Sequence, residues 1–306
     1  MTERSQGPAS GRSGADAART GPGTEAGERA TAPRSPLVMG VVNVTPDSFS
    51  DGGVYSDPER AVEHGLALVA DGADVLDVGG ESTRPGSEPV GEAEELARVL
   101  PVVRALALRA RVPISVDTTK ARVAEEALAA GASIVNDVSA GRAEPRILAV
   151  AARAKAGYAL MHMLGTPRDM QSDPRYDDVV SEVRAFLRER ADAALAAGVE
   201  RSKLWIDPGI GFGKTLAHNL ELLRRLRELT ELGYPVLLGV SRKSFIAGVE
   251  EAAGCARSAA DERLGGSLAA LAIGVVNGAS ILRVHDVRAA KQAALVASAL
   301  APSAGS

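Results

Sequence analysis

Eight short apolar runs in this 306-residue chain end in side chains that can bind or activate a small polar molecule. Each run is rich in Val, Ile and Leu, and a loop and an Ala- and Leu-rich segment of helical periodicity follow it. The polar side chains at or just after the run ends are Asn43, Thr83, Arg84, Asp117, Asn136, His162, Asp207, Lys243, Arg283 and His285. This mixture can bind a ligand that carries both hydrogen-bonding groups and negative charge.

Two successive runs, ISVD and SIVND, end in Asp117 and in the pair Asn136 and Asp137. An amide beside a carboxylate makes a wall that both donates and accepts hydrogen bonds, which suits a flat heterocycle with an amidine-like edge. The alternative is a structural hydrogen-bond network among strand ends, because buried polar groups need partners. The sequence leaves both interpretations open.

A basic cluster follows the last two runs. Lys243 comes after the seventh run, and Arg283 and His285 are two positions apart, so that in a strand they share one face. Asp286 is on the other face and is expected to be the N-cap of a helix over 287–300. Because barrels often bind phosphate near their seventh and eighth strands, we expect an anion site here.

The sixth run continues into a glycine-rich loop, LWIDPGIGFGKT. Pro208 stands where a phosphate-binding loop needs glycine, and the glycines alternate instead of following the dinucleotide-binding spacing. We therefore expect a loop that lets its backbone approach a ligand, with Asp207 beneath it and Phe212 exposed. In the fifth run, we interpret Met161 as part of an apolar shelf and His162 as a core histidine.

Two loops could close over a substrate. The first, NVTPDSFSDGG, contains Asp51 and an apolar Phe49 in polar surroundings, although turn chemistry alone would also explain its composition. The second, ESTRPGSEPVG, places Arg84 between Thr83 and Pro85. A surface ion pair is the alternative for a single arginine, and its position just past a strand favours a functional role.

Eight strand-and-helix units predict an α/β fold, a single (β/α)8 barrel over residues 37–306 with its active site at the carboxyl ends of the strands. Residues 1–36 have no apolar run, so we expect a disordered tail. A net charge of -4 indicates neither a nucleic acid nor an anionic membrane as partner. With one cysteine, Cys255, and no secretory signal or apolar membrane span, a cytoplasmic setting is expected.

From about Leu37 onward, the chain resembles the dihydropteroate synthase family, the folate-pathway transferases inhibited by sulfonamides. The resemblance rests on NVTPDSFSDGG, DVGGESTRPG, SVDTTK, NDVSAG, DPGIGFGK, GVSRKS and RVHDV, all in the family's order. Departures are mild: a Gln that relatives often carry after MHM is absent, and Thr119 stands where Ser is frequent.

The resemblance implies that 6-hydroxymethyl-7,8-dihydropterin pyrophosphate condenses with p-aminobenzoate to 7,8-dihydropteroate and pyrophosphate, by an SN1-like path with Mg²⁺, in a homodimer. It implies a pterin site of Asp117, Asn136, Met161, Asp207 and Lys243. The implied pyrophosphate site contains Asn43, Arg84, Arg283 and His285, with Mg²⁺ held by Asn43 and phosphate oxygens. The implied p-aminobenzoate site contains Phe49, Thr83, Pro85, Phe212 and Ser244. The implied catalytic residues are Asp51, Asp117, Lys243, Arg283 and His285.

Two other functions are compatible with a pterin-binding barrel. A methyltetrahydrofolate-dependent corrinoid methyltransferase has no pyrophosphate to bind, so the basic cluster and the first loop favour the synthase. A catalytically silent pterin-binding paralogue should have lost loop or anion-site residues, and this sequence has kept them.

Overall fold

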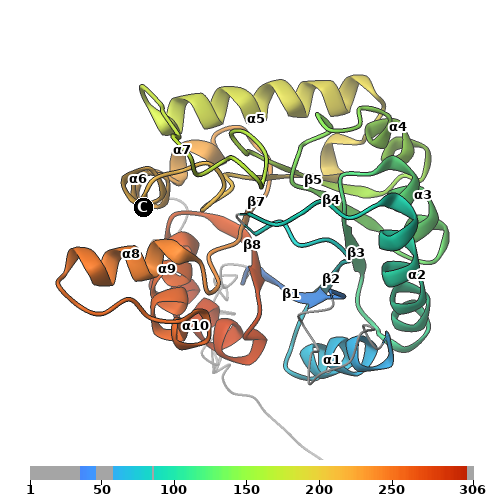
Figure 1. Cartoon of the computed structure of the whole chain (residues 1–306), viewed down its shortest axis with the longest axis horizontal. Helices are drawn as coiled ribbons and strands as arrows, with labels where there is room; N and C mark the ends of the chain where they lie inside the picture. The colour runs from blue at the N-terminus through green and yellow to red at the C-terminus, as the bar shows by residue number, and fades with distance from the viewer. Residues whose placement is uncertain (1–34, 46–57, 85, 302–306) are drawn as a thin grey trace, which may run out of the picture. The chain divides into compact units, whose positions relative to one another are not determined.

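The computed structural model describes residues 35–45, 58–84 and 86–301. In this part of the chain, eight parallel strands close into a barrel in chain order (Figure 1). The strands are β1 (Leu37–Asn43), β2 (Val75–Gly79), β3 (Ile114–Asp117), β4 (Ile134–Asp137), β5 (Gly157–Met161), β6 (Leu204–Asp207), β7 (Val236–Leu238) and β8 (Ala279–Val284). The predicted (β/α)8 barrel is confirmed, whereas the predicted tail lies, apart from residues 35 and 36, outside the described residues.

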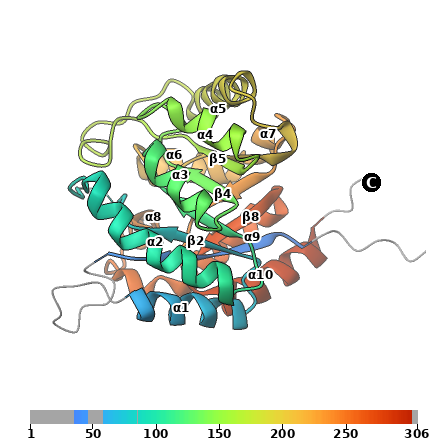
Figure 2. The same ribbon diagram turned by 90° about the vertical axis from the view of Figure 1, so that its right-hand side faces the viewer.

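Helices surround the strands in both views of the barrel (Figures 1 and 2). Among the described residues these are α1 (Pro58–Ala70), α2 (Glu92–Arg109), α3 (Ala121–Ala129), α4 (Arg146–Arg153), α5 (Val179–Ala196), α6 (Leu216–Arg224), α7 (Arg227–Thr230), α8 (Ser244–Ala252), α9 (Leu264–Val276) and α10 (Val287–Leu300). Two short 3-10 turns are η2 (Arg201–Lys203) and η3 (Ala260–Glu262). No helix in this part of the chain is long and apolar enough to span a membrane.

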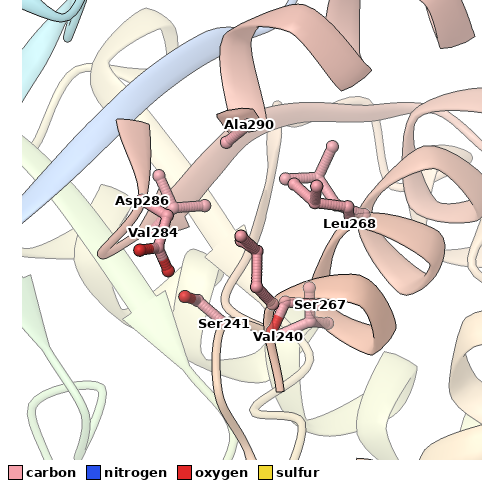
Figure 3. A pocket seen from close by; sticks show the side chains of 9 residues that line it. Val240, Ser241, Ser267, Leu268, Val284, Asp286 and Ala290 are labelled. Carbon is pink, nitrogen blue, oxygen red and sulfur yellow. The ribbon is translucent and has the colours of Figure 1, made fainter. Parts of the chain in front are cut away.

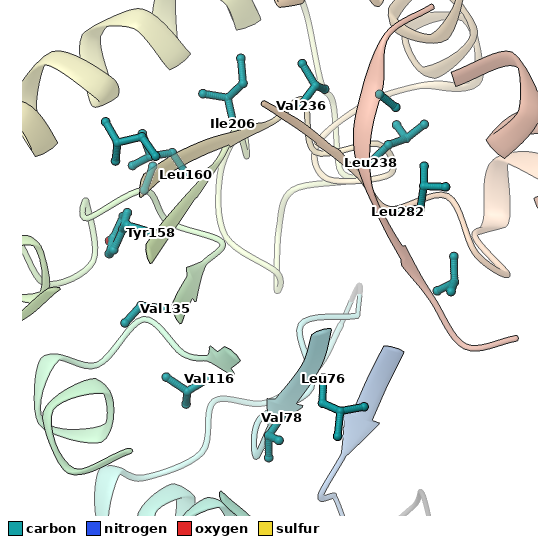
Figure 4. Packing of buried hydrophobic residues seen from close by; sticks show 14 of the residues in the cluster. Leu76, Val78, Val116, Val135, Tyr158, Leu160, Ile206, Val236, Leu238 and Leu282 are labelled. Carbon is teal, nitrogen blue, oxygen red and sulfur yellow. The ribbon is translucent and has the colours of Figure 1, made fainter. Parts of the chain in front are cut away.

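Strand residues alternate between two environments because successive side chains point to opposite faces of a strand. On β2, Leu76 and Val78 belong to the large core between strands and helices, which Figure 4 shows for strands from β2 to β8. Val75 instead packs with a separate set of side chains from β1, β4, β5, β7 and β8. Asp77, two residues after Val75, shares its inward face. The barrel interior is therefore apolar in one layer and polar in the layers above it.

Candidate active site

The register of the strands places three of the predicted site residues close together at neighbouring strand ends. Asn43 of β1 is paired with Gly79 of β2, Gly79 with Asp117 of β3, and Asp117 with Asn136 of β4. Because the strands are parallel, these residues share the carboxyl end of the barrel. The glycine between Asn43 and Asp117 has no side chain, and a Cβ there would lie 3.4 Å from the Asp117 Cβ.

Asp117 and Asn136 are buried, and each uses one side of its polar group for a protein partner. Asp117 Oδ2 accepts a 2.7 Å hydrogen bond from Arg283 Nη2. The Asn136 amide nitrogen donates to Asp77 Oδ2 over 3.0 Å. The hydrogen bonds among described residues leave Asp117 Oδ1 and Asn136 Oδ1 as acceptors for a ligand.

Asp207, at the end of β6, has the same arrangement. Its Oδ1 accepts a 2.7 Å hydrogen bond from the Gly209 backbone N–H, in the glycine-rich loop, and Oδ2 is left for a ligand. Lys243, from the loop after β7, donates to the Ile210 carbonyl, and its ammonium lies 4.5 Å from the centre of the Phe212 ring. An ammonium over an aromatic face is favourable. The loop, its carboxylate and the lysine thus form one unit.

The charges of these groups depend on one another. Burial raises the pKa of Asp117, while the positive charge of Arg283 opposes that rise. Burial lowers the pKa of Lys243 to about 8, with Asp207 opposing the change. Burial also disfavours the charged form of Arg283, but Asp77 and Asp117 offset this effect and hold its pKa above the usual value. Arg283 therefore stays charged between two carboxylates.

Arg283 keeps part of its guanidinium for another ligand. Its Nε donates to Asp77 over 2.7 Å and its Nη2 to Asp117. Nη1 has no partner among the described residues and can donate to an anion. The structure thus brings Arg283 to Asp117 of the predicted pterin site and to Asp77, which was not predicted, and only one of its three nitrogens remains for a phosphate.

His285 is oriented by the Ser241 hydroxyl, which lies 3.0 Å from Nδ1 and accepts the His285 backbone N–H over 3.3 Å. A hydroxyl that accepts from the backbone can donate its own hydrogen to Nδ1, which leaves the ring proton on Nε2. Burial, then the charges of Arg283 and Arg242, lower the pKa of His285 to about 4, and Arg84 adds to the effect. The His285 ring is therefore neutral and offers one N–H donor near the positive charges of Arg283, Arg242 and Arg84.

Asp286 was expected to cap α10, and this expectation is wrong. It precedes the helix, but its side chain makes no capping hydrogen bond. Instead it binds Arg242 through two bonds, Nε to Oδ2 at 3.0 Å and Nη2 to Oδ1 at 2.7 Å. Figure 3 shows Asp286 with Ser241 beside a small, mainly apolar cavity. The bidentate pair outweighs the cap because it makes two charge-assisted hydrogen bonds to a full positive charge, where a cap would make one to a neutral backbone N–H.

Met161 lies in an apolar cluster with Val138, Met163 and Met170, so the predicted apolar shelf is confirmed. Phe212, which was expected to be exposed, is instead partly buried against this cluster. Other predicted residues are placed at the edge of the site. Thr83 and the exposed Arg84 lie in the loop after β2, and the exposed Ser244 begins α8. Phe49, Asp51 and Pro85 lie outside the described residues.

His162 is a core histidine, as expected, but its partner was not anticipated. Its Nδ1 lies 2.9 Å from the ammonium of Lys214, which also donates to the Phe212 carbonyl over 2.9 Å. Burial, followed by the charge of Lys214, lowers the pKa of His162 to about 2. Burial lowers the pKa of Lys214 to about 7. A lysine inside an apolar, glycine-rich loop was the sequence signal that could have revealed this contact.

Lys214→Met is expected to flatten the pH dependence of stability between pH 7 and 10. The folded-state pKa of Lys214, about 7, lies below the ordinary value of 10.5, so the unfolded chain binds more protons in this window. The free energy of unfolding that this group contributes therefore rises with pH. Urea unfolding at several pH values measures the slope. Lys155→Met, at an exposed position, is the control. If the free energy of unfolding of Lys214→Met rises with pH as steeply as that of the parent and the control, Lys214 does not have the lowered pKa.

The predicted metal site rests on one ligand in the described chain. Within residues 35–45, 58–84 and 86–301, no group of three or more His, Cys, Asp or Glu side chains could hold a metal ion. Asn43 supplies a neutral amide oxygen at the barrel mouth. A single protein ligand fits Mg²⁺, which commonly keeps water and substrate phosphates as its other ligands. It does not fit a metal whose ligands must all come from the protein.

Fold and site together define a barrel enzyme that binds a flat polar molecule and an anionic group at its strand ends. A family model described as "Pterin binding enzyme" matches residues 39–285. A dihydropteroate synthase from Synechocystis sp. is 46% identical over 263 residues, covering 86% of this chain and 89% of the relative. The chain belongs to the dihydropteroate synthase family.

Two solved structures agree with this assignment. A Xanthomonas albilineans dihydropteroate synthase with 4-aminobenzoic acid has a TM-score of 0.80 and 50% identity, covering 87% of this chain and 93% of that chain. The enzyme from the same organism in complex with 7,8-dihydropteroate has a TM-score of 0.76 and 47% identity, covering 87% of this chain and 94% of that chain. These findings favour the synthase over the corrinoid methyltransferase.

Proposed function

We propose that this chain is a dihydropteroate synthase, which condenses 6-hydroxymethyl-7,8-dihydropterin pyrophosphate with p-aminobenzoate to 7,8-dihydropteroate and pyrophosphate. The observation that carries the proposal is the set of buried acceptors on Asp117, Asn136 and Asp207 beside the ammonium of Lys243. A pterin has a complementary edge, because its amino and ring N–H groups donate hydrogen bonds and its carbonyl accepts one from an ammonium. Met161 supplies an apolar contact for the ring.

Pyrophosphate departure is assisted by donors at the rim of the site. Arg84, the remaining nitrogen of Arg283 and the Nε2–H of His285 stabilise the negative charge that the leaving group acquires. Asn43 and the phosphate oxygens would hold Mg²⁺, which when bound offsets the same charge. These donors are placed before the reaction begins, so little reorganisation is needed as the bond breaks.

The pterin methylene becomes cationic as pyrophosphate leaves, which describes an SN1-like path. Negative charge on Asp117 and Asp207 favours this cation, and loop closure would shield it from water. The amine of p-aminobenzoate then attacks the methylene carbon, the new C–N bond forms and the amine loses a proton to solvent. Asp51 belongs to the proposed catalytic residues, and no general base is required.

The p-aminobenzoate site is proposed to lie between the loop after β2 and the start of α8. Its residues are Phe49, Thr83, Pro85, Phe212 and Ser244. The Phe212 ring packs on the methionine cluster and beneath the Lys243 ammonium, so it is held in place before an aromatic ring arrives. A sulfonamide that resembles p-aminobenzoate should compete for this site.

The proposed function is tested by incubating the protein with the pterin pyrophosphate, p-aminobenzoate and Mg²⁺. Equal amounts of dihydropteroate and pyrophosphate are expected, and a sulfonamide should reduce both. A folded protein that binds pterin but forms no dihydropteroate would instead be a catalytically silent paralogue.

His285→Ala is expected to slow pyrophosphate release about 100- to 1,000-fold even when p-aminobenzoate is omitted, which is the usual effect of losing one preorganised donor to a developing anion. In an ionisation path the pterin cation is trapped by water, so release needs no amine. Release is measured at saturating pterin pyrophosphate. His218→Ala, in the N-terminal turn of α6, is the control.

Two outcomes would change this part of the proposal. If pyrophosphate leaves the parent protein only in the presence of the amine, the reaction is a concerted displacement. If His285→Ala releases it as fast as the parent, the anion binds elsewhere.

A homodimer and a cytoplasmic location complete the proposal. Ile273 of α9 and Leu295 and Val296 of α10 are each more than half exposed, at 53%, 53% and 56%. These neighbouring helices offer apolar side chains to a second copy of the chain. Light scattering should give twice the chain mass of 31.5 kDa. The free, exposed Cys255 is compatible with a reducing compartment.

A further inference from the structure

Asp77 is an ionisable residue in the middle of a barrel strand. It lies on β2 one layer below the strand ends, with an exposed fraction of 0%. Its Oδ1 accepts no hydrogen bond in the described part of the chain. A buried polar atom without a partner costs free energy, and an apolar residue here would extend the layer begun by Val75. Packing therefore gives no reason for a carboxylate at this position.

The second oxygen of Asp77 joins two groups of the site. Oδ2 accepts hydrogen bonds from Arg283 Nε over 2.7 Å and from Asn136 Nδ2 over 3.0 Å. These donors come from β8 and β4, which lie two strands away from β2 in the two directions around the barrel. Arg283 in turn holds Asp117, so one buried carboxylate connects to three groups of the strand-end site.

The bond to Asn136 decides which atom of its amide a ligand meets. A side-chain amide can exchange its oxygen and nitrogen by a half turn, and the two orientations present opposite hydrogen-bonding groups. A carboxylate such as Asp77 can only accept, so it holds the nitrogen of Asn136 on its own side. The oxygen of Asn136 is then left to accept from a ligand.

We propose that Asp77 is a positioning residue that makes Asn136 an acceptor and thereby selects heterocycles with an amino group on the facing edge. This inference rests on the proposed function and names a determinant of its substrate specificity. Asp77 touches no substrate; it acts through Asn136 and Arg283. Without it, Asn136 could turn and meet the same edge with its N–H groups.

Asp77→Leu tests the proposal. Leucine has the branched shape of aspartate but cannot accept from the Asn136 amide nitrogen, so that amide is free to turn. Asp77→Asn should keep the parental preference, because its one amide oxygen can replace Oδ2, which accepts from both Arg283 and Asn136. Calorimetry compares two probes, 2-amino-4-oxopteridine and pteridine-2,4-dione, in which an oxygen acceptor replaces the amino donor. The parent should prefer the amino compound. Asp77→Leu should lose about 10-fold or more of that preference, because a favourable hydrogen bond to the amino group is replaced by the contact of two donors. Asp192→Asn, at an exposed position of α5, is the control.

A second variant covers the case in which Asp77→Leu does not fold. Asp77→Asn combined with Asn136→Asp exchanges the two groups, so that the amide at 77 donates to the carboxylate at 136. The number of charges is kept and an acceptor again faces the ligand. Preference for the amino compound is therefore expected to return.

The outcomes separate this inference from the proposed function. If Asp77→Leu weakens both probes equally, or keeps the parental preference, Asp77 has only a structural role and the inference is wrong. An exchanged variant without the preference contradicts it too. If the parent itself binds neither pteridine, the proposed function fails and this inference fails with it.

Discussion

Arg283→Met is expected to abolish dihydropteroate synthesis and to lower the free energy of unfolding by about 3–5 kcal/mol, the usual cost of removing one partner from a buried ionic group. The Arg283 guanidinium bridges Asp77 and Asp117, whose side chains are 0% and 8% exposed. Methionine fills a similar volume but leaves both carboxylates without a cation. Urea unfolding measures the loss.

A triple variant separates the loss of stability from the loss of activity. Arg283→Met with Asp77→Asn and Asp117→Asn removes all three charges while nearly keeping their shapes. It should recover much of the lost stability, since no uncompensated charge is left, and it should stay inactive. An Arg283→Met protein as stable as the parent would show that the two carboxylates do not depend on this arginine.

Asp207→Asn is expected to weaken binding of a non-reactive pterin by roughly 2–5 kcal/mol, because an acceptor is replaced by a donor opposite an N–H group in a buried site. Its effect on stability should be small. The asparagine oxygen can still accept from the Gly209 backbone, as Oδ1 of Asp207 does. Asp207 therefore isolates ligand binding from folding.

Asp117→Asn should weaken pterin binding as well, but its interpretation is less direct because Asp117 also binds Arg283. Calorimetry on Asp207→Asn, with Asp192→Asn as the exposed control, gives the cleaner comparison. Equal affinity in Asp207→Asn and the parent would mean that the pterin binds away from β6.

The barrel could be predicted because each strand is a short apolar run and each run is followed by a helical pattern, both of which are local properties. The strand-end position of Asp117, Asn136 and Asp207 followed from the same pattern, since parallel strands bring their carboxyl ends together. The role of Asp77 could not be predicted. Its partner Arg283 lies 206 residues away and reaches it only when β8 closes the barrel against β1.

Local rules failed where a distant partner competed with them. Asp286 has the sequence position of a helix N-cap, yet Arg242, 44 residues away, takes both of its oxygens. Lys214 was predicted only as part of a glycine-rich loop, yet folding buries its ammonium against His162, 52 residues away. In both cases the local sequence pattern predicts the backbone conformation. Contacts with distant residues decide where the carboxylate of Asp286 and the ammonium of Lys214 lie.

A crystal structure of the protein with 7,8-dihydropteroate tests the site assignment most directly. The pterin ring is expected to lie at the carboxyl end of the barrel with its N–H edge toward Asp117, Asn136 and Asp207. The Lys243 ammonium should donate to the ring carbonyl. A ring bound away from these strand ends, or turned so that its carbonyl faces Asp207, would show that these residues do not bind the pterin as proposed.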